Sequence, residues 1–121
     1  MMDRRRTNAE IRQWYMDQVS LIPDLNRQWL AEGLSARERA AKAWSIRHTA
    51  RLDARAMMGD PTEVELLRAR DMALYGNVDG PTFEFLVEQR RQAGLEEQAV
   101  YEAIIEGAYR TNVGINRRFG L

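Results

Sequence analysis

Apolar side chains recur every three to four residues along most of this chain, which is the spacing of one face of an α-helix. The clearest example is the segment 35–58. Its apolar face carries Ala40, Ala43, Trp44, Ala50, Ala54, Met57 and Met58. No stretch of useful length alternates apolar and polar residues as a β-strand does. The sequence therefore predicts an all-α fold over residues 7–121, a single compact domain of about six to seven helices without a sheet.

The helix boundaries are marked by capping residues, proline and glycine. Such residues satisfy, or avoid, the unpaired backbone groups at helix ends. The expected starts are at Thr7, Asp24, Ser35, Asp60, Pro81, Glu96 and Thr111. The expected stops are at Pro23, Gly33, Gly59, Gly76, Gly94 and Gly120. The starts at Thr7 and Ser35 are capping-box patterns, because a glutamate follows three residues later.

The composition is that of an ordinary globular domain, with 45% hydrophobic and 30% charged residues and a net charge of zero. The charge balance argues against nucleic-acid binding by bulk positive charge, while a local basic patch is left open. Because the chain has no cysteine and only His48 as histidine, disulfides are excluded and neither a metal nor a cofactor is expected. No apolar run is long enough for a membrane span. Residues 1–6 are basic without an apolar continuation, so a disordered N-terminus is expected there.

Several basic residues stand on or beside the apolar face of the segment 35–58. Arg47 and Arg51 project into the middle of that face, while His48 and Arg55 line one edge. A guanidinium cannot lose its proton to escape burial, so it requires a fixed anion, either a carboxylate of the protein or part of a ligand. In a functional interpretation the arginines bind a phosphate or carboxylate and His48 transfers a proton. In a structural interpretation the arginines pair with buried acids and cross-link helices, and His48 is a structural histidine with its hydrogen bonds satisfied.

Asp71 is the candidate partner for one of these arginines. It points into the apolar stripe of the helix expected after Asp60, and Arg68 lies beside it. That stripe consists of Val64, Leu67, Leu74 and Tyr75. A buried carboxylate requires partners as much as a buried guanidinium does, so we expect Asp71 to meet Arg47 or Arg51 across a helix–helix contact. Such a pair supports the structural interpretation and leaves the other arginine free to bind something else.

The turn-rich stretch 75–83 admits two interpretations. It either stops one helix and starts the next, or presents Asn77, Asp79 and Thr82 to a site as a rigid loop. The candidate catalytic residues are His48, Arg47, Arg51 and Asp71, and the candidate binding residues are Arg55, Arg68, Asn77 and Asp79. The chain has no phosphate-binding glycine loop, nucleophile elbow or metal-ligand spacing.

Five short stretches carry a resemblance to a known family. They are TNAEIRQWY at 7–15, IRHTAR at 46–51, RARD at 68–71, YGNVDGPTF at 75–83 and RTN at 110–112. Together they resemble a domain found at the C-terminus of bacterial polymorphic toxins of the Rhs type. Val78 stands where relatives have proline, which loosens the turn. The resemblance implies a secreted antibacterial effector domain, cut from a larger carrier, delivered into a target cell and neutralised by a cognate immunity protein.

Two functions from different classes follow from these patterns. The favoured hypothesis is a toxin domain, a hydrolase or nuclease-like enzyme if it is catalytic, with a site on Arg47, His48 and Arg51 and a phosphate-bearing target such as nucleic acid or a nucleotide. The alternative is a non-catalytic helical protein–protein interaction module with structural arginines, which would be cytoplasmic. A polar cleft open to solvent at His48 would favour the toxin. Burial of Arg47 and Arg51 against internal carboxylates would favour the module.

Overall fold

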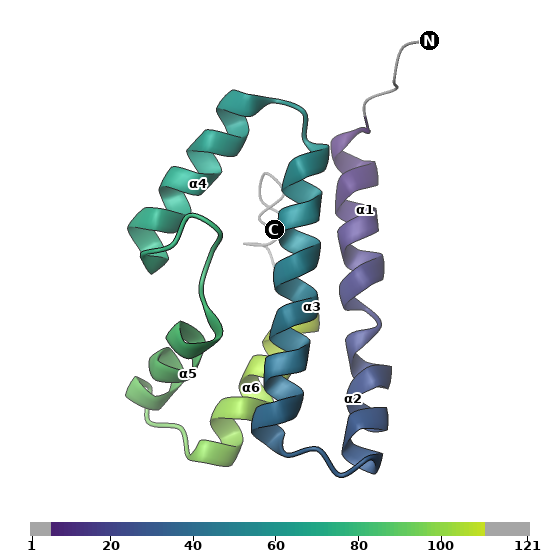
Figure 1. Cartoon of the computed structure of the whole chain (residues 1–121), viewed down its shortest axis with the longest axis vertical. Helices are drawn as coiled ribbons and strands as arrows, with labels where there is room; N and C mark the ends of the chain where they lie inside the picture. Colours follow the sequence, from purple (N-terminus) through teal and green to yellow (C-terminus); the bar gives the residue numbers. More distant parts are fainter. Residues whose placement is uncertain (1–5, 111–121) are drawn as a thin grey trace.

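The computed structural model describes residues 6–110, and every regular element in that part of the chain is an α-helix. The helices are α1 (Asn8–Val19), α2 (Ile22–Ala31), α3 (Ala36–Met57), α4 (Pro61–Tyr75), α5 (Phe83–Gln92) and α6 (Glu97–Tyr109). Only two residues separate α1 from α2, and the two helices continue in the same direction as one kinked rod (Figure 1). The all-α prediction is confirmed. Counted in this way, the described residues form five helical rods, fewer than the six to seven helices expected.

Two expectations concern the ends of the chain. Residues 1–5 of the N-terminal stretch, and the short helix expected after Thr111, lie outside the described residues. Arg6 belongs to the described part, and its guanidinium donates a hydrogen bond to Met57 Sδ at 2.8 Å. Between residues 6 and 110, none of the helices combines the length and the apolar character that crossing a membrane requires.

The N-caps predicted at Thr7, Ser35 and Asp60 are confirmed. Thr7 accepts a hydrogen bond from the amide three residues later at 3.1 Å, and Asp60 from the amide two residues later at 2.9 Å. Ser35 and Glu38 form both bonds of a capping box. Each bond satisfies an N–H that the first helical turn leaves unpaired. At the other end of α4, Gly76 adopts the left-handed conformation with φ of +70°, which glycine tolerates without strain.

The expected roles of Pro23 and Pro81 are wrong. Pro23 lies in the first turn of α2, where its missing N–H would have had no intrahelical acceptor. Asp24 therefore lies inside α2 and does not cap it. Pro81 precedes α5, which begins at Phe83, because the Thr82 hydroxyl caps the helix by accepting a backbone hydrogen bond at 3.1 Å.

The core forms where α1, α2 and α6 pack against the long central helix α3 and where α5 packs against α6 (Figure 1). The fully buried apolar residues of α3 are all alanines: Ala40, Ala43, Ala50 and Ala54. The bulky core residues come from the surrounding helices: Ile11, Tyr15, Val19, Ile22, Val87, Val100, Tyr101, Ile104 and Ile105. Small side chains on α3 allow these bulky side chains to pack close to its backbone. The core therefore requires small residues at the alanine positions.

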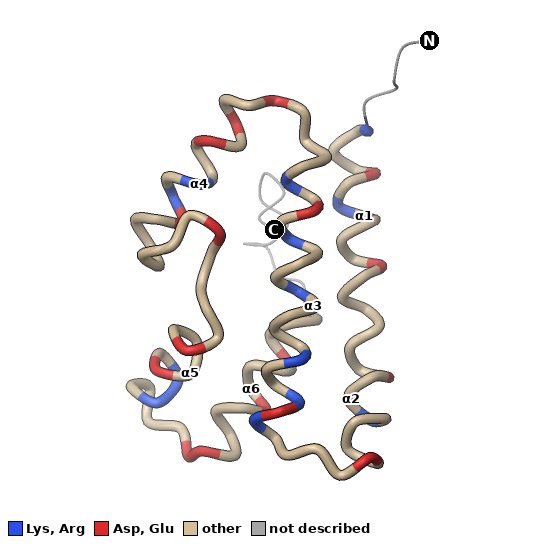
Figure 2. Tube along the Cα trace, viewed as in Figure 1, with Lys and Arg blue, Asp and Glu red and all other residues tan. Residues whose placement is uncertain are grey.

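Charge is segregated between α3 and α6, which pack closely together. α3 carries six basic and two acidic residues, whereas α6 carries three glutamates and no basic residue (Figure 2). The buried Arg39 of α3 donates to Glu102 of α6 at 2.9 Å and to Asn26 of α2 at 2.9 Å. The net charge of zero thus conceals opposite charges on two packed helices, which attract each other more strongly where water is excluded.

Replacing Ala54 by leucine should lower the free energy of unfolding by about 1–3 kcal/mol, because the larger side chain overfills the core. Ala54 is fully buried, whereas Ala56 on the same helix is exposed. Ala56→Leu is the matched control, since the change in helix propensity is the same, and it should shift stability by less than about 0.5 kcal/mol. Urea unfolding followed by circular dichroism measures both variants. Equal midpoints would contradict the packing described for α3.

Candidate functional site

Arg51 and Arg55 of α3 share one buried carboxylate, that of Asp71 in α4. Arg51 Nη2 lies 3.0 Å from both carboxylate oxygens, and Arg55 Nη2 donates to Oδ2. Asp71 is 0% exposed, and the two arginines are 7% and 4% exposed. The predicted contact between Asp71 and Arg51 is confirmed. Arg55, expected at the edge of the helix face, is a second buried partner of the same carboxylate.

α4 is attached to the bundle largely through this charged contact. Asp71 is its only fully buried residue. Val64, Leu67 and Tyr75 of the predicted stripe are half-buried, but Leu74, expected with them, is 54% exposed. The expectation for Leu74 is wrong: it is exposed although it lies about one helical turn after the buried Asp71. The orientation of α4 is therefore determined by a carboxylate more than by apolar packing.

Arg51, Arg55 and Asp71 form a buried guanidinium cluster, in which each charge depends on a partner because water is excluded. Burial lowers the pKa of Arg51, and the Asp71 carboxylate opposes this change, so the guanidinium stays charged. The Nε atoms of Arg51 and Arg55 find no acceptor among the described residues, and each such atom costs about 1–3 kcal/mol. Without Asp71, two buried cations would lack their anion. The contact thus fixes where α4 can lie.

The same arginines hold the backbone of the loop 76–82. Arg55 Nη1 donates to the Val78 carbonyl oxygen at 3.1 Å. Gly80 lies directly against the Arg51 guanidinium, so that a Cβ at this position would clash with Nη1. Both contacts are made by backbone atoms of the loop. The side chains of the guanidinium cluster therefore act as a support for the loop.

Asn77 and Asp79 are bound locally. Asn77 Oδ1 accepts from the Asp79 amide at 2.8 Å, which is an Asx turn, and the Asp79 carboxylate lies 3.7 Å from Arg68 Nη1. Arg68 also lies 3.4 Å from Glu65. Arg55, Arg68 and Asp79 line one pocket of about 430 Å³ between the end of α3 and the start of α4. Three of the four predicted binding residues meet there, whereas Asn77 does not line the pocket.

His48 is a packing residue in this structure. Its half-buried ring stacks on Trp44, with centroids 4.7 Å apart and 16° between the planes, and makes no hydrogen bond within the described residues. Burial lowers the pKa of His48; Asp79 partly opposes this effect, and the charge of Arg51 lowers the pKa further. Trp44 in turn donates from Nε1 to the Pro81 carbonyl oxygen at 3.1 Å. Trp44 therefore binds the loop through a backbone carbonyl group, as Arg55 does.

Arg47 binds the end of a helix and no carboxylate of the described residues. Its Nη1 donates to the Gly107 carbonyl oxygen of α6 at 2.8 Å, and its Nε to the Tyr15 hydroxyl of α1 at 3.2 Å. Gly107 belongs to the last turn of α6, where carbonyl groups carry partial negative charge and lack an intrahelical partner. α6 has no basic residue in its own last turn. Arg47 of α3 supplies that positive charge. Its partner is a backbone carbonyl group, whereas the sequence led us to expect either a protein carboxylate or a ligand.

The four candidate catalytic residues do not form one site. Arg51 and Asp71 touch, whereas His48 stacks on Trp44 and Arg47 binds α6. His48 lines neither the pocket at Arg68 nor a second pocket beside α1. The contacts of Arg51 support the structural interpretation of the buried arginines.

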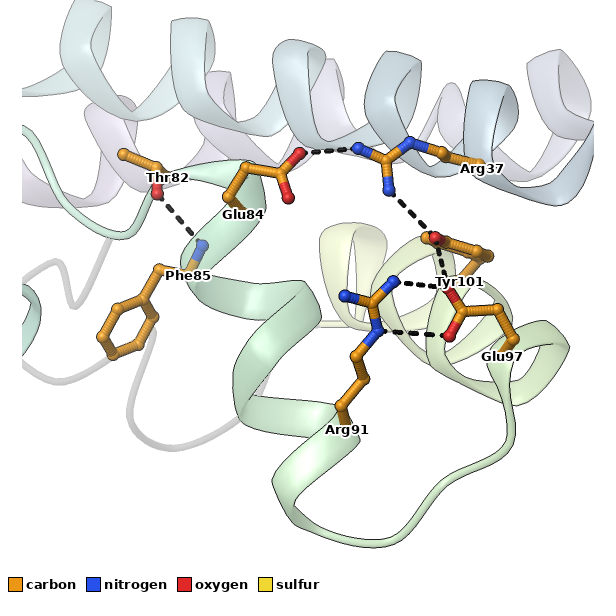
Figure 3. A network of polar contacts seen from close by, with 7 residues as sticks. All are labelled: Arg37, Thr82, Glu84, Phe85, Arg91, Glu97 and Tyr101. Atoms are coloured by element: carbon orange, nitrogen blue, oxygen red, sulfur yellow. Dashed lines mark hydrogen bonds and ion pairs between the residues drawn. The ribbon is translucent and has the colours of Figure 1, made fainter.

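Sequence reasoning missed a polar network that joins α3, α5 and α6 (Figure 3). Arg37 donates to Glu84 at 2.6 Å and to the Tyr101 hydroxyl at 2.9 Å, while Tyr101 donates to Glu97 at 2.8 Å. Glu97 also accepts from Arg91 Nε at 3.1 Å, and the hydrogen bonds from Arg91 and then Tyr101 lower its pKa to about 2. Glu97 and Tyr101 have the i, i+4 spacing of neighbours on one helix. Arg37, Glu84 and Arg91 come from two other helices, and no spacing along the chain predicts that they join this pair.

Within the described residues, no group of three or more His, Cys, Asp or Glu side chains could hold a metal ion. Comparisons of the chain with models of protein families, with curated proteins and with solved structures find no match.

Asp71→Leu should lower the free energy of unfolding by about 3–5 kcal/mol, because it leaves two buried guanidinium groups without their anion. Arg51→Leu should cost less, since Arg55 still pairs with the Asp71 carboxylate. In the double variant the loss should be smaller than the sum by at least about 1 kcal/mol. Urea unfolding of the four proteins in the cycle measures this coupling. The exposed pair Arg91 and Glu97 is the control and should show a coupling below about 1 kcal/mol. Strict additivity for Arg51 and Asp71 would show that they are not coupled.

Gly80→Ala should destabilise the protein more than Gly33→Ala does. Both glycines have positive φ, +100° and +86°, so alanine costs about 1–2 kcal/mol at each position. An added Cβ meets nothing within 4 Å at Gly33 but meets Arg51 at Gly80, and Arg51 cannot move without leaving Asp71. Thermal and urea unfolding should therefore separate the variants by at least about 1 kcal/mol. Equal effects would mean that the Arg51 side chain yields without cost.

Proposed function

We propose that this chain is a helical protein-interaction domain in which the buried arginines stabilise the fold and take no part in catalysis. Arg51 and Arg55 are bound to Asp71, and Arg47 is bound to the Gly107 carbonyl group. The observation that carries the proposal is the surface of α4, which exposes large apolar side chains although the helix has a single fully buried residue.

The outer face of α4 is apolar around one positive charge. Leu66 and Leu74 are 59% and 54% exposed, and they lie one helical turn before and after Arg70. Ala69 and Ala73 are exposed beside them. These five residues define the outer face of α4. Apolar residues that are grouped on a surface, as here, are typical of protein-interaction sites, whereas single exposed leucines are common.

The proposed partner is a protein that presents apolar side chains around a carboxylate. Arg70 is exposed and forms no ion pair within the described residues, and covering it with a partner requires an anion. The small residues Ala69 and Ala73 allow a partner helix to approach the backbone of α4 closely. If the chain is the toxin domain that its sequence resembles, the cognate immunity protein is such a partner.

A second candidate function is that of an antibacterial effector domain, delivered into a target cell, which acts on a phosphate-bearing target. Arg47 supports it, because this half-buried cation has no carboxylate partner among the described residues. His48 would move the proton in such a reaction. Its lowered pKa favours the neutral imidazole at pH 7, which is the form that a general base requires.

The double change Leu66→Glu and Leu74→Glu should weaken partner binding at least about 100-fold, because it places two unpaired charges in an apolar interface. Partners are identified by affinity capture from the producing cells and then titrated as purified proteins by calorimetry. Leu30→Glu is the matched control, since Leu30 on α2 is 58% exposed, and it should change the affinity less than about twofold. Circular dichroism and thermal melting verify that each variant is folded.

Further outcomes of this experiment separate the two candidates. Arg70→Glu should weaken binding, and exchanging the facing carboxylate of the partner for lysine should restore it. Binding that survives the changes at Leu66 and Leu74 would contradict the proposed surface. Growth inhibition by the expressed wild type that disappears in His48→Ala, at unchanged melting temperature, would support the effector instead.

A further inference from the structure

Two arginine side chains from different helices converge on Gly107 of α6. Arg47 of α3 donates to the Gly107 carbonyl oxygen at 2.8 Å. Arg90 of α5 approaches the same residue, and its Nη2 would lie 3.4 Å from a Cβ built at position 107. Both side chains are half-buried. The two positions are far apart in sequence, so only the packing of α3, α5 and α6 makes them neighbours.

Within residues 6–110, most hydrogen-bond donors of this pair have no acceptor. Arg47 uses Nε and Nη1, and Arg90 donates only to Oε1 of its chain neighbour Gln89 at 3.3 Å. A guanidinium has five N–H donors in a planar fork, which matches two oxygens of an oxyanion. Neither arginine forms an ion pair with a carboxylate within the described residues. The pair therefore has free donors of the kind that bind phosphate.

Among the residues that the structure describes, the positive charges of Arg47 and Arg90 exceed the negative charge that faces them. Burial lowers the pKa of Arg90, and the charge of Arg47 lowers it further. Both guanidinium groups nevertheless remain cationic at neutral pH. The end of α6 offers about half a negative charge. An anion between the two groups would remove their mutual repulsion.

We infer that Arg47 and Arg90 form a binding site for a phosphate group, either inorganic phosphate or the terminal phosphate of a nucleotide. A phosphate monoester is a dianion with enough oxygens for two guanidinium forks, whereas a carboxylate has charge for only one. Arg47 is fixed by Tyr15 and by α6, so it presents a preformed half of the site, and Arg90 supplies the other half. The site shares no residue with the outer face of α4 and stands independently of the proposed interaction.

Isothermal titration calorimetry with inorganic phosphate at about pH 8 tests this site on the full chain, because phosphate is then mainly dianionic. Sodium chloride keeps the ionic strength constant. The wild type should bind one phosphate saturably, and Arg90→Gln should weaken binding at least about tenfold. Arg91→Gln is the matched control, since the adjacent Arg91 is exposed and paired with Glu97, and it should stay within about twofold. Arg90→Lys should bind more weakly than the wild type, because a point charge replaces a fork.

Two further measurements identify the ligand and test whether Arg47 and Arg90 contact it or have only a structural role. Adenosine monophosphate binding more tightly than phosphate would assign the site to a nucleotide, and equal affinities would assign it to the phosphate group alone. The side-chain ¹⁵N resonances of Arg47 and Arg90 should shift on addition of phosphate, while that of Arg91 should not. Absence of saturable binding, or equal binding by wild type and Arg90→Gln, would overturn the site. If Arg90→Gln does not fold, the affinity of Arg90→Lys and the resonance shifts still show whether the two arginines bind phosphate.

Discussion

The buried charge of Arg51 and Arg55 is the constraint on which one half of this molecule depends. Two guanidinium groups on α3 require an anion, and Asp71 is the carboxylate that meets both. Because Asp71 is the only fully buried residue of α4, the position of that helix follows from this electrostatic requirement. The loop after α4 follows as well, since Gly80 and the Val78 carbonyl group lie on the same arginines.

The other half of the molecule depends on the small alanine side chains of α3 and on the C-terminal end of α6. Alanines on α3 admit the bulky residues of α1, α2 and α6, and the basic character of α3 is complementary to the acidic α6. Arg47 links both features, because it crosses from α3 to the last turn of α6 and also binds Tyr15 of α1. The positive charge of Arg47 is thus stabilised by the partial negative charges of backbone carbonyl groups at the end of α6, without a carboxylate.

This division has consequences for function. An arginine that supports a buried carboxylate is unavailable to a ligand unless the fold opens, so Arg51 and Arg55 are poor candidates for recognition of a target. Two surfaces whose arginines form no ion pair within residues 6–110 lie elsewhere. They are the outer face of α4, with its apolar residues around Arg70, and the pair formed by Arg47 and Arg90. The two surfaces have different chemistry, and we propose that the apolar one binds a protein and the cationic one a phosphate group.

The sequence by itself determined the helical class, most helix boundaries and the requirement that Arg51 and Asp71 find charged partners. Those properties are local: helical periodicity, side-chain bonds to amides in the first turn, and the cost of an unpaired charge on an apolar face. It did not determine that Arg55 joins the same carboxylate, that Leu74 faces outward or that Arg90 approaches Arg47. Only the tertiary structure decided these points, because the rotation of each helix about its axis is set by contacts between helices, which leave no pattern within a single helix.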